Sequence, residues 1–152
     1  MPSSSSKADA LKPYRFRVFV YGTLRPGGYY YRQICQGRVS FSLPALMRGQ
    51  LFHLDAGYPA LCEGDDWVRG DVLAFDDPQL MDDIDTLEGY DPTAASEPSE
   101  YERKTAPAFD LDHQVLGKLA AYWMTPERIA AEGGQYVVGG DWHQWNGSRR
   151  LT

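Results

Sequence analysis

Residues 18–28 constrain the fold more than any other stretch, because an apolar run turns abruptly into residues that favour a loop. Phe16–Tyr21 contains two β-branched valines and predicts a strand. Gly22 and Gly27 then allow backbone angles that other residues avoid, and Pro26 fixes one angle. A strand ending in such a loop can aim successive backbone N–H groups at an anion or a developing oxyanion. A buried strand followed by an ordinary turn is the alternative that this stretch alone leaves open.

Composition describes an ordinary globular domain with an acidic balance. The 152 residues are 43% hydrophobic and 24% charged, which fits one domain with a sizeable core. Aromatic residues reach 13%, which favours strands and a lined pocket but equally suits core packing. The net charge of −6, without a basic stripe, argues against a nucleic-acid partner.

The cysteines and histidines do not form recognisable metal or disulfide motifs. Cys35 and Cys62 lie far apart and are expected to be reduced thiols in a cytoplasmic protein. The three histidines are widely separated, so no metal site is expected. No apolar run approaches the ~18 residues of a transmembrane helix, so no membrane partner is expected.

One domain is expected, with a tail at each end. Residues 1–14 include four consecutive serines and lack the apolar segment of a signal peptide, which predicts a disordered N-terminal tail. No linker or internal repeat interrupts the rest of the chain. The sequence therefore predicts a single domain over residues 15–145 and a C-terminal tail over residues 146–152.

The chain after the first loop begins with irregular signals. Tyr29–Gln36 predicts a short helix. Arg38–Leu46 alternates only weakly and contains Pro44, which interrupts the pattern. Leu46–Leu54 predicts a strand with a β-bulge at Gly49.

Further strands separated by turns are predicted over residues 58–75 and residues 101–124. Tyr58–Cys62 predicts a short edge strand, because its proline cannot donate to a ladder. Glu63–Asp66 predicts a turn, and Trp67–Phe75 alternates as a strand does. Tyr101–Phe109 and Gln114–Met124 then predict a hairpin.

The best helix signal covers Pro78–Leu87. Asp77 can cap its N-terminus, proline suits its first turn, and apolar residues recur at helical spacing. Three acidic residues lie mostly on the other face and are expected to be solvated: Asp82, Asp83 and Asp85. Gly89 is the expected stop, which places Glu88 at the C-terminal end of the helix.

Glu88 and Tyr122 are the two side chains with the strongest claim to chemistry. The negative end of the helix dipole and partial desolvation would both raise the pKa of Glu88 toward the range useful for proton transfer. The alternative is a surface carboxylate, one of 21 acidic residues. Tyr122 can present its hydroxyl to a polar ligand or simply pack in a strand. No nucleophile elbow, Walker loop or dinucleotide motif occurs in the chain.

Paired motifs in a consistent order resemble a known family. The segments that carry the resemblance lie between residues 16 and 125: Val20–Arg25, Gly57–Ala60, Leu87–Tyr90, Tyr101–Arg103 and Ala121–Met124. Together they are similar to the gamma-glutamylcyclotransferase-like superfamily, which includes AIG2-like proteins. The resemblance implies an α+β fold, a small and mostly antiparallel mixed β-barrel flanked by short helices.

The resemblance also implies a reaction on a small-molecule γ-glutamyl compound. The free α-amine attacks its own γ-carbonyl, which releases 5-oxoproline and an amine or amino acid. Glu88 matches the family's catalytic glutamate, and Tyr122 matches a substrate-contacting tyrosine. The family's substrate loop matches four residues: Tyr21, Gly22, Thr23 and Leu24. Neither a metal nor another cofactor is implied.

Two departures and two other functions stay open. Arg25 differs from some relatives, and the composition of residues 91–100 is specific to this chain, so the leaving group is not carried over. The same fold could act as a non-catalytic module that binds a small molecule or a protein. Water could also replace the amine, which would make the protein a γ-glutamyl amide hydrolase. Retention of Glu88 favours an enzyme, because a pure binder gains little from a desolvated carboxylate.

Overall fold

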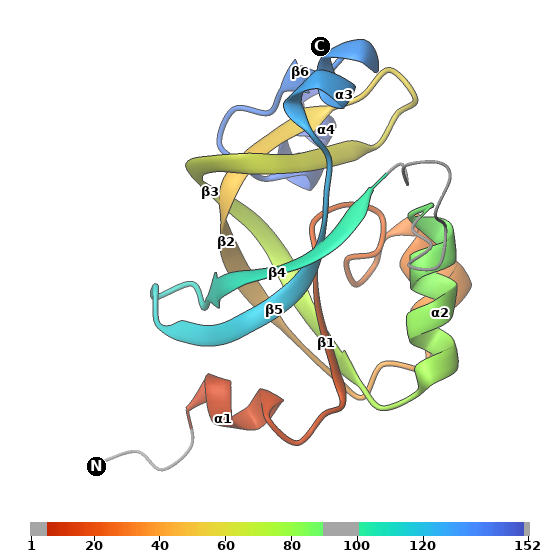
Figure 1. Cartoon of the computed structure of the whole chain (residues 1–152), viewed down its shortest axis with the longest axis vertical. Helices are drawn as coiled ribbons and strands as arrows, with labels where there is room; N and C mark the ends of the chain where they lie inside the picture. The colour runs from red at the N-terminus through yellow and green to blue at the C-terminus, as the bar shows by residue number, and fades with distance from the viewer. Residues whose placement is uncertain (1–5, 90–100, 151–152) are drawn as a thin grey trace.

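The computed structural model describes residues 6–89 and 101–150, which form one α+β unit (Figure 1). The described strands are β1 (Phe16–Val20), β2 (Phe41–His53), β3 (Pro59–Phe75), β4 (Glu102–Phe109), β5 (Val115–Trp123) and β6 (Gln135–Tyr136). The described helices are α1 (Lys7–Leu11), the π-helix η1 (Tyr31–Cys35), α2 (Pro78–Leu87), α3 (Pro126–Ala131) and α4 (Trp142–Arg150). The predicted α+β class is confirmed.

Five of the strands pair in a closed ring. Antiparallel pairs join β1 to β3, β3 to β2, β2 to β4 and β4 to β5. A parallel contact between Val18 and Ala120 then joins β5 to β1. In Figure 1, α2 stands along one side of this ring, and α3, α4 and β6 gather where the chain ends. The ring brings the C-terminal end of β1 between strands from the middle and the end of the chain.

The predicted turn at Glu63–Asp66 is wrong. Both flanking strand predictions merge into β3, which runs without a break from Pro59 to Phe75. Along β2, Gly49 pairs with Asp66 and the next residue pairs with Cys62, so residues 63–65 have no partner on β2. The turn-forming residues are absorbed as a bulge because both halves of β3 stay paired with one long neighbour. The register shift falls at Gly49, where the bulge was predicted, but the extra residues lie on β3 and not on β2.

Pro44 does not interrupt β2, contrary to the prediction. It pairs with Asp71 of β3, and its side chain is exposed. On the other edge of β2, β4 pairs only at Leu46 and Met47, so no described strand lies opposite the missing N–H of Pro44. Alternation across Pro44 also holds, because Leu43 and Ala45 are both buried.

The helices agree with the sequence in the middle of the chain and differ at its ends. α2 has the predicted bounds, and the Asp77 side chain accepts from Gln79 N. The predicted helix at Tyr29–Gln36 contains the short π-helix η1. Residues 7–11 form α1 inside the predicted disordered tail, because the fully buried Leu11 anchors them to the core. α4 runs from Trp142 through Arg150, beyond the predicted domain end.

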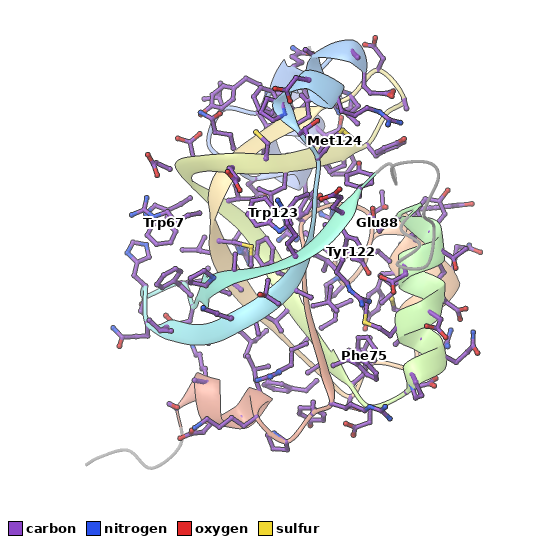
Figure 2. All side chains as sticks on the ribbon, in the orientation of Figure 1. Trp67, Phe75, Glu88, Tyr122, Trp123 and Met124 are labelled. Atoms are coloured by element: carbon purple, nitrogen blue, oxygen red, sulfur yellow. The ribbon has the colours of Figure 1, made fainter. Side chains whose placement is uncertain are left out.

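Two apolar cores lie on opposite faces of the ring strands. The strand alternation sends successive side chains to opposite faces, so Trp123 packs inside the ring and Tyr122 packs outside it, toward α2 (Figure 2). The inner core includes Phe19, Met47, Val72, Leu119 and Trp123. The outer core includes Val18, Leu73, Phe75, Leu80 and Ile84. The outer core fixes α2 against the sheet and thereby fixes where α2 ends.

Gly70 allows β3 to approach β1, and enlarging it tests that packing. A Cβ atom at Gly70 would lie 2.2 Å from Val20 O and 2.7 Å from Cζ of Phe19. Since backbone atoms cannot yield as a flexible side chain can, Gly70→Ala is expected to lower the free energy of unfolding by about 2 kcal/mol. Urea denaturation measures the change. Gly147→Ala is the control, because nothing lies within 4 Å of that added atom; equal stability of both variants would contradict the expected overlap.

Candidate active site

A cavity of about 150 Å³ opens between the end of β1 and the C-terminal end of α2. Its walls come from five separate parts of the chain. The lining residues are Phe19, Val20, Tyr21, Gly22, Thr23, Leu24, Tyr30, Tyr58, Pro59, Leu87, Glu88, Tyr101 and Tyr122. All six residues that the sequence singled out for a site therefore line one cavity.

The loop that follows β1 forms one wall. A Cβ atom at Gly22 would lie 2.8 Å from Cγ of Pro59, so glycine lets the loop lie directly against β3. Leu24 is buried in the outer core, and the N–H of Tyr31 donates to Thr23 O at 3.0 Å. The loop is thus held by packing on one side and by η1 on the other.

Glu88 forms the opposite wall and contributes the only carboxylate among the described lining residues. Its N–H donates to Ile84 O at 3.0 Å, which makes it the C-cap of α2. Gly89, with φ of 69°, ends the helix as predicted. The residue is half-buried, and Figure 2 shows it at the end of α2 on the side that faces Tyr122.

A second carboxylate supports the cavity from behind. The hydroxyl of Tyr122 donates to Oδ1 of Asp85 at 2.6 Å, and Nη1 of Arg103 donates to Oδ2 of Asp85 at 2.6 Å. Burial raises the pKa of Asp85, although Tyr122 and Arg103 both oppose the rise. Tyr122 is thereby held with its hydroxyl proton directed at Asp85, which leaves its oxygen able to accept a hydrogen bond.

Two buried phenols stay protonated beside Glu88. Burial raises the pKa of Tyr21 well above its usual value, and the charge of Glu88 adds to the rise. Burial likewise raises the pKa of Tyr122, with further contributions from Asp85 and Glu88. The Tyr21 hydroxyl donates to Tyr122 O at 2.6 Å. Both phenols therefore act as neutral, fixed groups near the carboxylate.

Sequence reasoning missed several members of the site. The expectation that Asp85 is solvated is wrong, because it is buried under Tyr122 and Arg103. The missed signal is its position three residues before Glu88, on the same face of α2. Tyr58 and Tyr101 line the cavity, and both belong to segments that carry the family resemblance without a predicted role.

The buried Asp85 predicts a pH-dependent change in stability. Since its folded pKa lies above the unfolded value of 3.8, the folded state binds more protons between those two values. The stability that Asp85 contributes is fully present at pH values below 3.8, and it is lost as the pH rises through the folded pKa. The free energy of unfolding of Asp85→Asn should therefore rise relative to wild type as the pH rises from 3.8 through the folded pKa of Asp85.

Urea titrations of both proteins at several pH values measure this difference. Asp82→Asn is the matched control, because it removes an exposed carboxylate from the same helix. A stability difference between wild type and Asp85→Asn that does not change over this range would contradict the burial effect.

The described residues show neither a metal-like cluster nor a membrane-length helix. No three His, Cys, Asp or Glu side chains are grouped as ligands within residues 6–89 and 101–150. In the same part of the chain, no helix has the length and apolar character needed to cross a bilayer. The lining residues of the cavity offer a carboxylate, hydroxyls and backbone groups to a ligand.

Comparisons with known proteins give one family match. A family model described as gamma-glutamyl cyclotransferase, AIG2-like, matches residues 18–144. The matched range contains all the lining residues of the cavity. Among curated proteins, no significant match is found.

Solved structures share the fold at low sequence identity. YkqA from Bacillus subtilis is 20% identical with a TM-score of 0.63; the match covers 90% of this chain and only 43% of YkqA. An AIG2-like protein from Mus musculus is 19% identical with a TM-score of 0.58, over 75% of this chain and 82% of that one. At5g39720.1 from Arabidopsis thaliana is 20% identical with a TM-score of 0.60, over 90% of this chain and 83% of that one. These similarities concern the fold.

Proposed function

The chain belongs to the gamma-glutamyl cyclotransferase, AIG2-like family, and from this we propose that it is a cyclotransferase that releases 5-oxoproline from a small γ-glutamyl compound. One observation carries the proposal: Glu88 and the loop of Gly22, Thr23 and Leu24 line the same cavity. The reaction needs a proton carrier and a set of anion-binding donors within one small space. Glu88 is the proposed proton carrier, and the backbone amides of this loop are the proposed donors.

Glu88 is proposed as the general acid and base. Its carboxylate takes a proton from the substrate's α-ammonium, whose nitrogen then attacks the γ-carbonyl carbon. The new carbon–nitrogen bond closes the 5-oxoproline ring, and the bond to the leaving amine breaks as Glu88 returns the proton to that nitrogen. The ring nitrogen loses its second proton to water, and the released amine takes up a proton from water, so protons and bonds balance without a cofactor.

The loop is proposed to hold negative charge. Its backbone N–H groups suit the α-carboxylate of the substrate or the oxyanion of the tetrahedral intermediate. Neutral amides also suit an acidic protein, because they provide a local positive potential without a basic side chain. Holding the γ-glutamyl chain bent, with its α-amine near its γ-carbonyl, should accelerate the reaction further, because the attack is intramolecular.

Tyr122 is proposed to contact the substrate through its hydroxyl oxygen. Its proton is directed at Asp85, so the oxygen can accept a hydrogen bond from the α-ammonium. That contact would orient the amine toward the γ-carbonyl before Glu88 removes its proton. Asp85 would then act through Tyr122 and not on the substrate.

Release of 5-oxoproline from a panel of γ-glutamyl compounds tests the proposal. The panel includes γ-glutamyl amino acids, glutathione and γ-glutamyl-lysine, because the leaving group is open. Release from at least one compound is expected. Free glutamate as product would point instead to an amide hydrolase. Thermal stabilisation by these compounds without any product would point to a binding module.

A cytoplasmic location is part of the proposal. Both cysteines, Cys35 and Cys62, are buried free thiols. Burial raises the pKa of the Cys35 thiol to about 11, which keeps it protonated and unreactive at neutral pH. Two inert thiols suit a reducing compartment, where a domain of this size is stabilised by its core and not by disulfides.

A further inference from the structure

A histidine of the last helix contacts the loop from outside the cavity. Nε2 of His143, on α4, lies 2.7 Å from Gly22 O. A carbonyl oxygen only accepts, so Nε2 carries the hydrogen in this contact. His143 is half-buried and is not among the described residues that line the cavity. It therefore reaches the loop from behind.

The contact fixes the direction of an N–H group. Gly22 C=O and Thr23 N–H belong to the same planar trans peptide, so they point in opposite directions. The N–H of Arg25 also donates to Gly22 O, at 3.1 Å. With its carbonyl held toward α4, this peptide directs the Thr23 N–H away from α4, and Thr23 itself lines the cavity.

The next peptide is held in the same way. Thr23 O accepts from the N–H of Tyr31 at 3.0 Å, so the N–H of Leu24 points away from η1. Within the described residues, neither the Thr23 N–H nor the Leu24 N–H has an acceptor in the protein. Two successive amides without acceptors, each anchored through the carbonyl of its own peptide, are available to donate to an anion.

We propose that His143 is a positioning residue that holds the Gly22–Thr23 peptide so that the Thr23 N–H faces the γ-glutamyl substrate. The inference rests on the proposed function of the cavity. His143 does not touch the substrate and acts only through this peptide. Without its hydrogen bond, the peptide is less restrained and the donor is no longer held ready for the charge that forms.

The surroundings keep the imidazole neutral. Burial lowers the pKa of His143, and the charge of Arg25 lowers it further, whereas the bond to Gly22 O and the carboxylates of Asp141 and Asp71 raise it. Burial prevails, so the ring is neutral at neutral pH and holds its hydrogen on Nε2. The carbonyl is therefore held without adding a charge behind the loop.

Two variants of His143 with the same amide group but different side-chain lengths test this role. The amide of His143→Gln can occupy the place of Nε2 and donate, whereas the shorter His143→Asn cannot reach Gly22 O. We expect kcat/KM for 5-oxoproline release to fall about 10- to 100-fold in His143→Asn and to stay within about threefold of wild type in His143→Gln. The backbone amide resonance of Thr23 should move in His143→Asn and return in His143→Gln. Gln144→Leu, at the adjacent exposed position of α4, is the control.

The two readouts separate this inference from the proposed function. Unchanged kcat/KM and an unchanged Thr23 resonance in a folded His143→Asn would overturn the positioning role while 5-oxoproline release by wild type still stands. An equal loss of kcat/KM in His143→Asn and His143→Gln would also overturn it, because the length of the side chain would then have no effect. If wild type releases no 5-oxoproline, the proposed function fails, and the Thr23 resonance in the two variants alone decides whether His143 holds the peptide.

Discussion

Replacing Glu88 by glutamine is expected to lower the rate of 5-oxoproline release by about 10²- to 10⁴-fold, the usual contribution of a general acid or base. Glutamine keeps the size of the side chain and its place at the end of α2, but it cannot carry the proton from the α-amine to the leaving amine. The loss should appear in kcat, since the cavity walls and the loop that would bind the substrate remain intact. Steady-state kinetics with the best substrate of the panel measures it.

Asp82→Asn provides the matched comparison for Glu88→Gln. Each change removes one carboxylate, Asp82 within α2 and Glu88 at its C-cap. Asp82, however, is exposed and lies outside the lining of the cavity. Asp82→Asn should retain the wild-type rate within about twofold. Turnover by Glu88→Gln at the wild-type rate would remove Glu88 from the mechanism and leave only the loop and Tyr122 as candidates.

Replacing Arg25 by alanine is expected to have the largest effect on stability, about 3 kcal/mol or more. Nε of Arg25 lies 2.7 Å from Oδ2 of Asp71, and Nη1 lies 3.1 Å from Oδ1 of Asp141. Arg25 and Asp71 are 8% and 9% exposed, so removing the guanidinium leaves a buried carboxylate without its partner. The variant should therefore unfold at a much lower urea concentration than wild type.

A double variant and a variant of a partly exposed arginine, Arg38, complete this experiment. Adding Asp71→Ala to Arg25→Ala should restore part of the lost stability, because it removes the uncompensated charge. Arg38→Ala breaks ion pairs with Asp77 and Asp83 whose side chains are all at least 31% exposed, and it should lower the free energy of unfolding by less than about 1 kcal/mol. A similar loss in Arg25→Ala and Arg38→Ala would show that burial does not set the strength of the Arg25 cluster.

The features that could be predicted from the sequence are those that depend on residues close together in the chain. Asp77 as a cap, proline in the first turn and apolar residues at helical spacing define α2 with its observed bounds. The same local signals place Glu88 at its C-terminal end. The pairing of Glu88 with the loop after β1 came from a family resemblance, because more than sixty residues separate them in the sequence.

The errors arise where long-range pairing or burial outweighs a local signal. Glu63–Asp66 has the composition of a turn, yet it stays in β3 because both sides of it pair with β2. Asp85 has the composition of a solvated helix face, yet Tyr122 and Arg103 satisfy its oxygens in a buried position. Propensity is a weak prior, and tertiary contacts override it at both places.

The sequence by itself determined the strand that leads into the glycine loop, the helix that ends at Glu88 and, through paired motifs, the family. Only the tertiary structure decided that the loop and Glu88 share a cavity, that Asp85 supports Tyr122, and that His143 holds the Gly22 carbonyl. The physical reason is that helix caps and alternation act between near neighbours in the chain. A hydrogen bond across 121 positions exists only once the ring of strands has closed and α4 has packed behind the loop.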